Sequence, residues 1–371
     1  MVPITKQANF DNQIQSAEIV LGCSELNQTL EFYNQILGLV IESIYPADEP
    51  KVAVLSGYGI RLRLEIGTSA DTGTLRLLCT NPSQIFAGQL QFQAPNGTTI
   101  ELIEALPEII LPPEKQSFVL CQLQQDSDWG LGRAGMQYRD LIPNRQGGRF
   151  IASHIRIPEG GPVPDYVHFH RVRFQLIFCY KGWVKVVYED QGEPFILKAG
   201  DCVLQPPTIR HRVLESSAGL EVVEVGCPAL HETFADTEMV LPNNSINPDR
   251  EFLGQKFVRH ISKTASWKSW RVAGFECRDS GIGTATAGLA GVNVIRPKDF
   301  SATEIQSHHE EFLFLFTLKG NMELSCEDQP LHRLNLGDSV VIPKMMKHAI
   351  TAASNDLEFL EVRMTDKFKT Y

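Results

Sequence analysis

The chain has 371 residues, of which 43% are hydrophobic, and its formal net charge is −10. This length favours two or three domains with buried cores, and the acidity argues against a nucleic-acid-binding surface or a polybasic membrane patch. The first residues lack the apolar stretch of a signal peptide, and the longest apolar runs, such as residues 312–316, are too short to cross a bilayer.

The N-terminal block, residues 14–105, mixes one predicted helix with strands. Ser24 is a candidate N-cap for this helix, whose apolar residues recur on one face at Leu26, Leu30, Tyr33 and Leu37. Six strand-like runs follow, at 39–43, 51–55, 61–66, 75–79, 90–93 and 99–103. The turn residues Pro95, Asn96 and Gly97 join the last two runs.

Residues 105–117 are rich in proline and polar toward their end, and we interpret them as a linker. From about residue 118 the chain consists of short β-patterned runs separated by Gly and Pro, which is typical of antiparallel sandwiches or barrels. An internal repeat lies within this part, offset by about 138 residues. Its first copy has Gly182, Gly200, Pro206 and His211, and its second has Gly320, Gly337, Pro343 and His348.

The repeat predicts two copies of one barrel after the N-terminal block. We place the three domains at residues 14–105, 118–228 and 251–366. The eight cysteines are scattered and form no CxxC pair, which is typical of reduced thiols in a chain of this length. We therefore predict a cytoplasmic protein that binds neither membrane nor nucleic acid.

The histidines of the first barrel carry the chemistry. His168 and His170 point to one face of a strand, because strand side chains alternate with period two. His211, in a later strand-like stretch, meets them if the sheet closes into a barrel. Together with the carboxamide of Gln175 they form a candidate transition-metal site. A barrel without a metal is the alternative.

This pattern resembles the cupin superfamily. His168, His170, Gln175 and Gly182 match the spacing of its first motif, with Gln175 where Glu is usual. Gly200, Pro206 and His211 match the second motif, whose usual Gly and Asn are replaced by Thr208 and Glu215. The resemblance implies a mainly β bicupin: two jelly-roll barrels with inward-pointing ligands, preceded by a smaller α+β module. It also makes a homodimer the expected assembly.

The donor set has consequences for chemistry. Three imidazoles and one amide are uncharged, so a bound ion would keep its full positive charge and favour an anionic ligand. Gln175 cannot act as a general base. Imidazole suits Fe(II), Mn(II), Ni(II), Cu(II) and Zn(II), among which we favour Fe(II). Strand parity places three further candidates in the pocket, Tyr166 beside the two strand histidines and Ile177 and Cys179 beside Gln175.

The second barrel has an incomplete copy of this set. Aligning the repeat places Gln306 and His308 at the first two histidine positions and His348 at the third, but Leu313 stands at the position of Gln175. A leucine cannot ligate a metal. We interpret this site as degenerate, with the barrel serving packing or substrate closure. A weak second metal at Gln306, His308 and His348 is the alternative.

Residues 17–104 resemble the vicinal oxygen chelate superfamily of glyoxalases and extradiol dioxygenases. The resemblance rests on the stretch from Ala17 to Leu39 and on residues 92–101, and it implies βαβββ units with metal-bearing positions near Glu18 and Glu101. The stretch 67–104 is too short for a complete second unit, and no histidine precedes His154. We therefore expect a structural, dimerising or small-molecule-binding module without a metal.

The sequence favours a metal-dependent oxygenase, as cupin dioxygenases for aromatic diols and hydroxy acids suggest by resemblance. Its substrate would be a small anionic, enolic, phenolic or hydroxy-acid molecule that chelates the metal, with O₂ as co-substrate. A non-redox isomerase, cyclase or lyase is a second interpretation. A bicupin that binds a small molecule without turnover is a third, since a fold does not fix a function.

Overall fold

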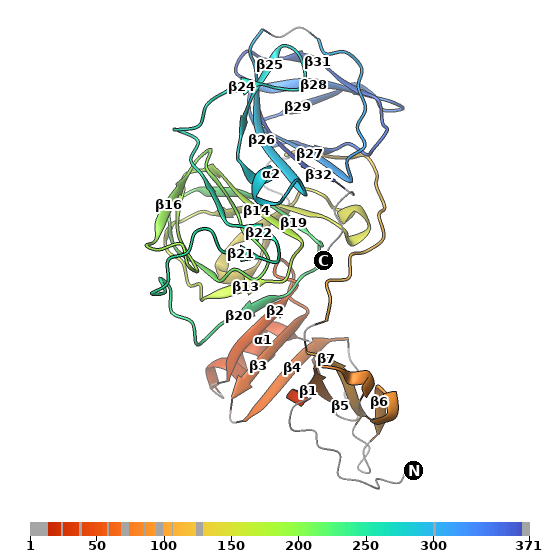
Figure 1. Cartoon of the computed structure of the whole chain (residues 1–371), viewed down its shortest axis with the longest axis vertical. Coiled ribbons are helices and arrows are strands. Elements are labelled where there is room, and N and C mark those ends of the chain that lie inside the picture. The colour runs from red at the N-terminus through yellow and green to blue at the C-terminus, as the bar shows by residue number, and fades with distance from the viewer. Residues whose placement is uncertain are drawn as a thin grey trace. The chain divides into compact units, whose positions relative to one another are not determined.

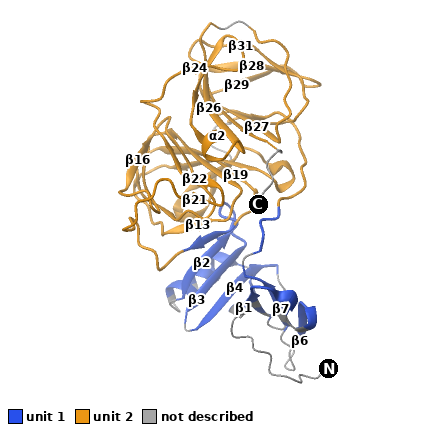
Figure 2. Ribbon diagram, viewed as in Figure 1, with its two compact units in different colours: residues 1–110, 232–235 blue, residues 111–231, 236–371 orange. Residues whose placement is uncertain are grey.

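The computed structural model describes residues 14–365 except 24, 37–38, 58, 68–73, 85, 94–98, 106, 124–128 and 300–301. The chain divides into two compact units (Figure 2). Unit 1 consists of residues 1–110 and 232–235, and unit 2 consists of residues 111–231 and 236–371. No helix in the described part is long and apolar enough to span a membrane.

Unit 1 is a mixed sheet with one short helix. The strands lie in the order β2-β3-β4-β1-β5-β7-β6, and β20 (Thr233–Ala235) pairs with the outer strand β2. The elements are β1 (Ile14–Cys23), α1 (Leu26–Glu31), the π-type turn η1 (Phe32–Ile36), β2 (Val40–Tyr45), β3 (Val52–Gly57), β4 (Ile60–Ile66), β5 (Thr74–Cys79), the 3₁₀ turns η2 (Pro82–Gln84) and η3 (Phe86–Gly88), β6 (Gln91–Gln93) and β7 (Thr99–Glu104).

The sequence predicted the β-α-β-β-β order of β1 to β4 correctly, and helical structure extends to Ile36, although its last five residues are π-helical. The α-helix ends at Glu31 and continues as the turn η1, while Leu26 packs beside the sheet residues Leu55 and Leu64. The candidate cap Ser24 and the turn at residues 95–97 lie outside the described residues. Between β5 and β6 only 3₁₀ turns are described, which agrees with a shortened second repeat.

The first barrel of unit 2 consists of two facing sheets. One has the order β9-β10-β11-β19-β14-β17-β23 and the other contains β16-β15-β18-β13, with β12 beside β18. The elements are β9 (Gly130–Leu131), η4 (Arg133–Gly135), β10 (Gln137–Asp140), η5 (Arg145–Gly148), β11 (Ile151–Ile157), β12 (Gly161–Pro162), β13 (His168–His170), β14 (Phe174–Lys181), β15 (Trp183–Tyr188), β16 (Phe195–Lys198), β17 (Cys202–Leu204), β18 (His211–Ser216), β19 (Leu220–Cys227) and β23 (Val258–His260).

The second barrel repeats this order. Its sheets are β24-β25-β26-β32-β27-β30-β8 and β29-β28-β31, and the hairpin β21–β22 precedes it (Figure 1). The elements are β8 (Val119–Cys121), β21 (Glu251–Phe252), β22 (Gln255–Lys256), β24 (Lys268–Ser269), β25 (Phe275–Asp279), α2 (Ile282–Ala285), β26 (Ala290–Pro297), β27 (Phe312–Lys319), β28 (Asn321–Cys326), β29 (His332–Asn335), β30 (Ser339–Val341), β31 (His348–Ala353) and β32 (Glu358–Met364).

The barrels exchange their edge strands. β8 lies before the first barrel in the chain but pairs with β30 of the second. β23 lies before the second barrel but pairs with β17 of the first. Each exchanged strand covers the edge that β17 or β30 would otherwise leave unpaired, and unpaired edges promote aggregation.

The alternation along β14 separates two cores. Phe174, Leu176 and Phe178 face a cluster shared with the second barrel, in which Phe150 stacks on Phe312 at 4.2 Å between ring centroids. The intervening residues face the interior of the first barrel, where Cys179 packs with the interior cluster and Gln175 is buried. The sequence of β14 is therefore almost continuously apolar, because both faces of this strand are covered.

The glycines that mark the repeat have a common structural role. Gly182 and Gly320 have φ angles of +72° and +67°, which favour glycine. A Cβ at either position would lie 2.3 Å from a serine hydroxyl, that of Ser217 or Ser354. Each of these hydroxyls accepts a hydrogen bond from the backbone N–H just after the glycine. The two barrels therefore share a turn as well as a strand order.

Candidate metal centre

Three histidines converge inside the first barrel, as the alternation predicted. β13 supplies His168 and His170, and His211 begins β18 directly opposite His168. Their ligand atoms all lie within 4.8 Å of one another, and all three side chains are buried. The ring centroids of His168 and His211 are 4.2 Å apart. In the described part of the chain this is the one group of three or more His, Cys, Asp or Glu residues with that geometry.

The backbone fixes the tautomers of two of these rings. His168 Nδ1 lies 2.7 Å from the carbonyl oxygen of Tyr166, and His211 Nδ1 lies 3.0 Å from that of Ile209. A carbonyl oxygen only accepts hydrogen bonds, so each Nδ1 must carry the proton. Each Nε2 therefore keeps a lone pair. This arrangement is typical of metal-ligating histidines.

Burial keeps the imidazoles neutral. Desolvation lowers the pKa of His168 well below its usual value, and the nearby Arg133 guanidinium adds to the effect. Desolvation also lowers the pKa of His170 well below its usual value, with His231 contributing, and it lowers the pKa of His211 to about 4. Neutral imidazoles with directed lone pairs suit a divalent transition metal.

Gln175 has a partner that sequence reasoning missed. Its Nε2 donates to Glu224 Oε1 at 2.6 Å. Glu224 belongs to β19, and its register neighbour is Ile177, which packs against the interior core. A carboxylate therefore lies beside the proposed amide ligand, where the sequence predicted only uncharged groups. The sequence could have indicated this position, because Glu224 alternates in phase with the core residues Leu220 and Val222 along the same strand. Ligation by Gln175 stays a prediction.

Arg133 is the second missed residue. Its Nη2 lies 3.1 Å from His168 Nε2, and its Nη1 forms an ion pair with the buried carboxylate of Asp165. The other oxygen of Asp165 accepts from the backbone N–H of Val213 at 2.9 Å, which fixes the carboxylate. The arginine comes from the turn η4, far from the histidines in sequence. A cationic fork thus reaches the histidine cluster.

His231 was also missed. Its ring lies perpendicular to that of His170, with centroids 5.2 Å apart. Its Nδ1 is 3.0 Å from the carbonyl oxygen of Pro228, so its Nδ1 carries the proton by the same argument. The residue follows β19 and belongs to neither motif found in the sequence.

The three predicted pocket residues occupy different places. Tyr166 is half-buried, its ring 5.8 Å from that of His168, and burial raises the pKa of its hydroxyl. Ile177 packs against the interior core. Cys179 lies within that core, its thiol donates weakly to the carbonyl oxygens of Lys181 and Gly182, and burial raises its pKa to about 12. Cys179 thus behaves as a small core residue.

The matching positions in the second barrel are held differently. His308 Nε2 lies 2.9 Å from the carbonyl oxygen of Ile342, and its Nδ1 accepts from the N–H of Glu310 at 3.1 Å, so both ring nitrogens are used. Gln306 forms a backbone bridge with His348. Leu313 is buried in the barrel core. This arrangement supports the interpretation of a degenerate site and gives no support to a second metal there.

An arginine–glutamate pair lies in this second barrel. Arg271 donates from both terminal nitrogens to Glu361, at 2.7 and 2.5 Å, and the Glu361 side chain is fully buried. Arg271 corresponds to Arg133 by the repeat offset and likewise follows the first strand of its sheet. The strand registers place Glu361 where the first barrel has Glu224.

In unit 1 the two expected metal-bearing positions are paired with arginines. Glu18 lies 3.6 Å from Arg61, and Glu101 lies 2.7 Å from Arg76. These ion pairs agree with a module that holds no metal through Glu18 and Glu101. Membership of the vicinal oxygen chelate superfamily stays a prediction.

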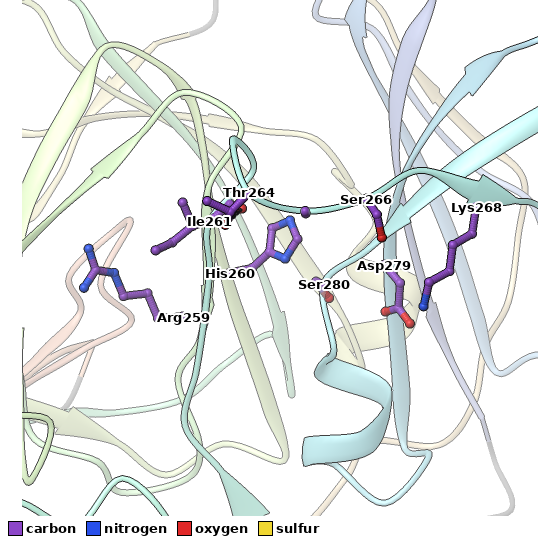
Figure 3. A pocket seen from close by; sticks show the side chains of 9 residues that line it. Arg259, His260, Ile261, Thr264, Ser266, Lys268, Asp279 and Ser280 are labelled. Atoms are coloured by element: carbon purple, nitrogen blue, oxygen red, sulfur yellow. Dashed lines mark hydrogen bonds between the residues drawn. The ribbon is translucent and has the colours of Figure 1, made fainter.

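A separate cavity of about 410 Å³ lies in unit 2, beside β23 and the β24–β25 hairpin (Figure 3). Its lining includes His260, Lys268 and Asp279 and none of the predicted site residues. Figure 3 shows the Lys268 amine directed toward Asp279 and the Arg259 side chain directed away from His260. The cavity is thus distinct from the histidine cluster.

Comparisons with known proteins agree with this fold. Residues 153–226 match the family model described as "Cupin domain". A salicylate 1,2-dioxygenase variant from Pseudoaminobacter salicylatoxidans in complex with gentisate is similar in structure, with 13% identity and a TM-score of 0.50 over 69% of this chain and 84% of that chain. Identity at this level shows the fold alone.

Two further solved structures have similar scores. YlbA from E. coli has 9% identity and a TM-score of 0.49 over 71% of this chain and 97% of its own. An oxalate decarboxylase OxdC variant from Bacillus subtilis has 15% identity and a TM-score of 0.48 over 70% and 81%. No curated protein sequence matches significantly. The family model thus identifies a cupin domain at residues 153–226, and the two barrels of one strand order give the chain a bicupin fold.

Proposed function

We propose that this bicupin is a metal-dependent dioxygenase acting on a small, anionic, oxygen-rich molecule. The observation that carries the proposal is the buried cluster of His168, His170 and His211, with ligand atoms within 4.8 Å of one another. Gln175 is the proposed fourth ligand. Fe(II) is the proposed metal, since it supports O₂ chemistry at open coordination positions. When bound, a divalent ion would polarise substrate oxygens and lower the pKa of a substrate hydroxyl.

The charges around the cluster support an anionic substrate. The Arg133 fork reaches within 3.1 Å of His168 and is held by Asp165 on its other side. Arginine forks form strong, directional hydrogen bonds with carboxylates. An enolate, phenolate or hydroxy acid bound beside the histidines would therefore meet a fixed donor.

The neighbouring side chains support chemistry that excludes water. Ile177 and Cys179 give this part of the barrel an apolar lining. Burial raises the pKa of the Tyr166 hydroxyl, so this group stays protonated at neutral pH and can donate to a substrate oxygen. A dry lining strengthens each of these polar contacts.

The test combines metal analysis with oxygen uptake. Protein produced with added iron should contain about one metal ion per chain and consume O₂ with gentisate or catechol-like compounds. A His211→Ala variant should lose both properties, while a His348→Ala variant should keep both. A folded wild-type protein that binds none of the five candidate metals would refute the proposal.

One observation favours a second function. Gln175 cannot serve as a base, but the Glu224 carboxylate lies 2.6 Å from its amide nitrogen. A carboxylate beside the proposed fourth ligand suits proton transfer in a non-redox isomerase, cyclase or lyase reaction. Turnover without O₂, or a protein that contains only zinc, would favour this function. Ligand binding without turnover under either condition would favour a binding protein.

Three wider expectations also stay proposals. The homodimer follows from the cupin resemblance. The cytoplasmic location rests on the eight scattered cysteines, whose pattern is typical of reduced thiols. For unit 1 we propose a structural, dimerising or small-molecule-binding role, because its two candidate acidic positions are paired with arginines.

A further inference from the structure

In the first barrel, Arg133 and the proposed metal compete for one lone pair, that of His168 Nε2. Because His168 donates from Nδ1 to the carbonyl oxygen of Tyr166 at 2.7 Å, its Nε2 is the nitrogen with the lone pair. The Nη2 of Arg133 lies 3.1 Å from this Nε2. A guanidinium has only donors and no acceptor. The contact is therefore a hydrogen bond from Arg133 to the very nitrogen that the proposed metal requires.

A lone pair cannot serve both partners at once. A divalent ion at Nε2 would lie about 2.1 Å from the nitrogen, in the direction that the Arg133 donor now uses. The guanidinium is also a permanent positive charge. Hydrogen-bond geometry and charge repulsion thus oppose simultaneous binding of Arg133 and a metal at His168.

We infer that Arg133 is a displaceable occupant of the metal centre, exchanging His168 for another acceptor when a metal ion binds. This inference rests on the proposed metal site. Asp165 anchors the other side of the guanidinium and is itself held by the N–H of Val213. The arginine can therefore release Nη2 from His168 while it keeps its ion pair. The released donor stays beside the metal, where an anionic ligand would accept its hydrogen bond.

The second barrel supports this inference independently. Arg271 stands at the equivalent position, and both of its terminal nitrogens bind the buried carboxylate of Glu361. An arginine at this point of the barrel thus reaches the strongest acceptor available to it. In the first barrel the equivalent Glu224 binds the amide of Gln175. Arg133 is left with Asp165 and a histidine nitrogen, and the second of these contacts is the weaker.

The experiment is a Mn(II) titration of the full chain, previously stripped of metal, followed by the EPR signal of the free ion. An Arg133→Met variant should bind Mn(II) about tenfold more tightly than the wild type, because one hydrogen bond and one repulsive charge are removed. The matched Arg271→Met variant should bind Mn(II) like the wild type. An Arg133→Lys variant separates the two causes, since lysine keeps the charge and loses the fork. The affinity of this variant for Mn(II) should lie between those of the wild type and the Arg133→Met variant.

Three results would overturn the inference. Equal or weaker Mn(II) binding by a folded Arg133→Met protein would show that Arg133 does not compete with the metal. Equal tightening by Arg271→Met would show a general charge effect. If neither the wild type nor the Arg133→Met variant bound Mn(II) or any other candidate metal, the proposed function would fail, and this inference would fail with it. Binding by the variant alone would support the inference in its strongest form.

Discussion

The two barrels have one strand order and one shared turn, yet their centres differ at two of the four ligand positions, where Gln306 and Leu313 replace His168 and Gln175. Gln175 in the first barrel holds Glu224 by its amide. Leu313 stands there in the second barrel and offers no hydrogen bond. The buried Glu361 therefore takes both donor groups of Arg271, because a buried carboxylate without a partner is costly. The partner of the arginine thus changes together with the residue at the position of Gln175.

The largest expected difference between the two barrels is in metal content. His211→Ala should reduce bound metal from about one ion per chain to almost none, because it removes one of three imidazole ligands. His348→Ala should leave the metal content unchanged, because Leu313 cannot ligate a metal and backbone contacts use both ring nitrogens of His308. Elemental analysis of the two purified variants measures this difference. Equal metal loss in both would show that the barrels are not functionally distinct.

The barrels should respond alike to acid when no metal is present. Burial lowers the pKa of His211 and of His308 to about 4 from 6.5. The unfolded chain therefore takes up protons below pH 6.5 while the folded chain does not, and the free energy of unfolding falls as the pH drops from 6.5 toward 4. The slope is about 1.4 kcal/mol per pH unit for each such histidine.

Urea unfolding with a chelator at pH 7, 6 and 5 measures this slope. A Gln substitution at His211 or at His308 should make the slope shallower by a similar amount. An unchanged slope in either variant would mean that its imidazole is already protonated in the folded protein.

The two glutamates should differ in their contribution to stability. Glu361→Gln removes the charge from a buried two-fold ion pair, and we expect a loss of about 2 kcal/mol, reduced because Arg271 is partly exposed and can regain water. Glu224→Gln keeps an oxygen that can accept from Gln175, so its expected loss is below about 1 kcal/mol. Urea unfolding at pH 7 compares the two variants. A larger loss for Glu224→Gln would reverse the assigned roles.

The smallest expected effect comes from restoring the ligand types in the second barrel. Adding an amide by Leu313→Gln, together with Gln306→His, restores the ligand types of the first barrel. We expect no additional metal in this protein, because Arg271 still neutralises Glu361 and His308 keeps both backbone contacts. Adding Arg271→Met should then allow weak metal binding, which isothermal titration with Zn(II) measures. Strong binding by the double variant alone would show that Arg271 does not matter.

Local patterns in the sequence predicted much of this site. The alternation predicted that His168 and His170 share a face, and the repeat predicted two barrels of one strand order. Arg133, Glu224 and His231 were missed because their roles depend on contacts between segments far apart in the chain. Arg133 reaches His168 from a short turn, and no local pattern gives the direction of such a side chain. The repeat offers one clue to the importance of Arg133, since Arg133 and Arg271 are separated by the offset of the repeat.

The helix of unit 1 shows a different limit of local patterns. The apolar spacing predicted a helix as far as Leu37, but the α-helix ends at Glu31 and a π-type turn follows. A π turn changes the number of residues per turn, so spacing alone could not indicate where the regular helix stops.

The exchange of β8 and β23 has a consequence for how the two halves can be separated. A cut within residues 241–250 would leave each fragment with a strand that belongs to the other fragment's sheet. Neither fragment would form a complete sandwich alone, and each would expose a hydrogen-bonding edge. Mixed together, the fragments would find in one another the missing strand, and the bicupin would reassemble as a complementing pair.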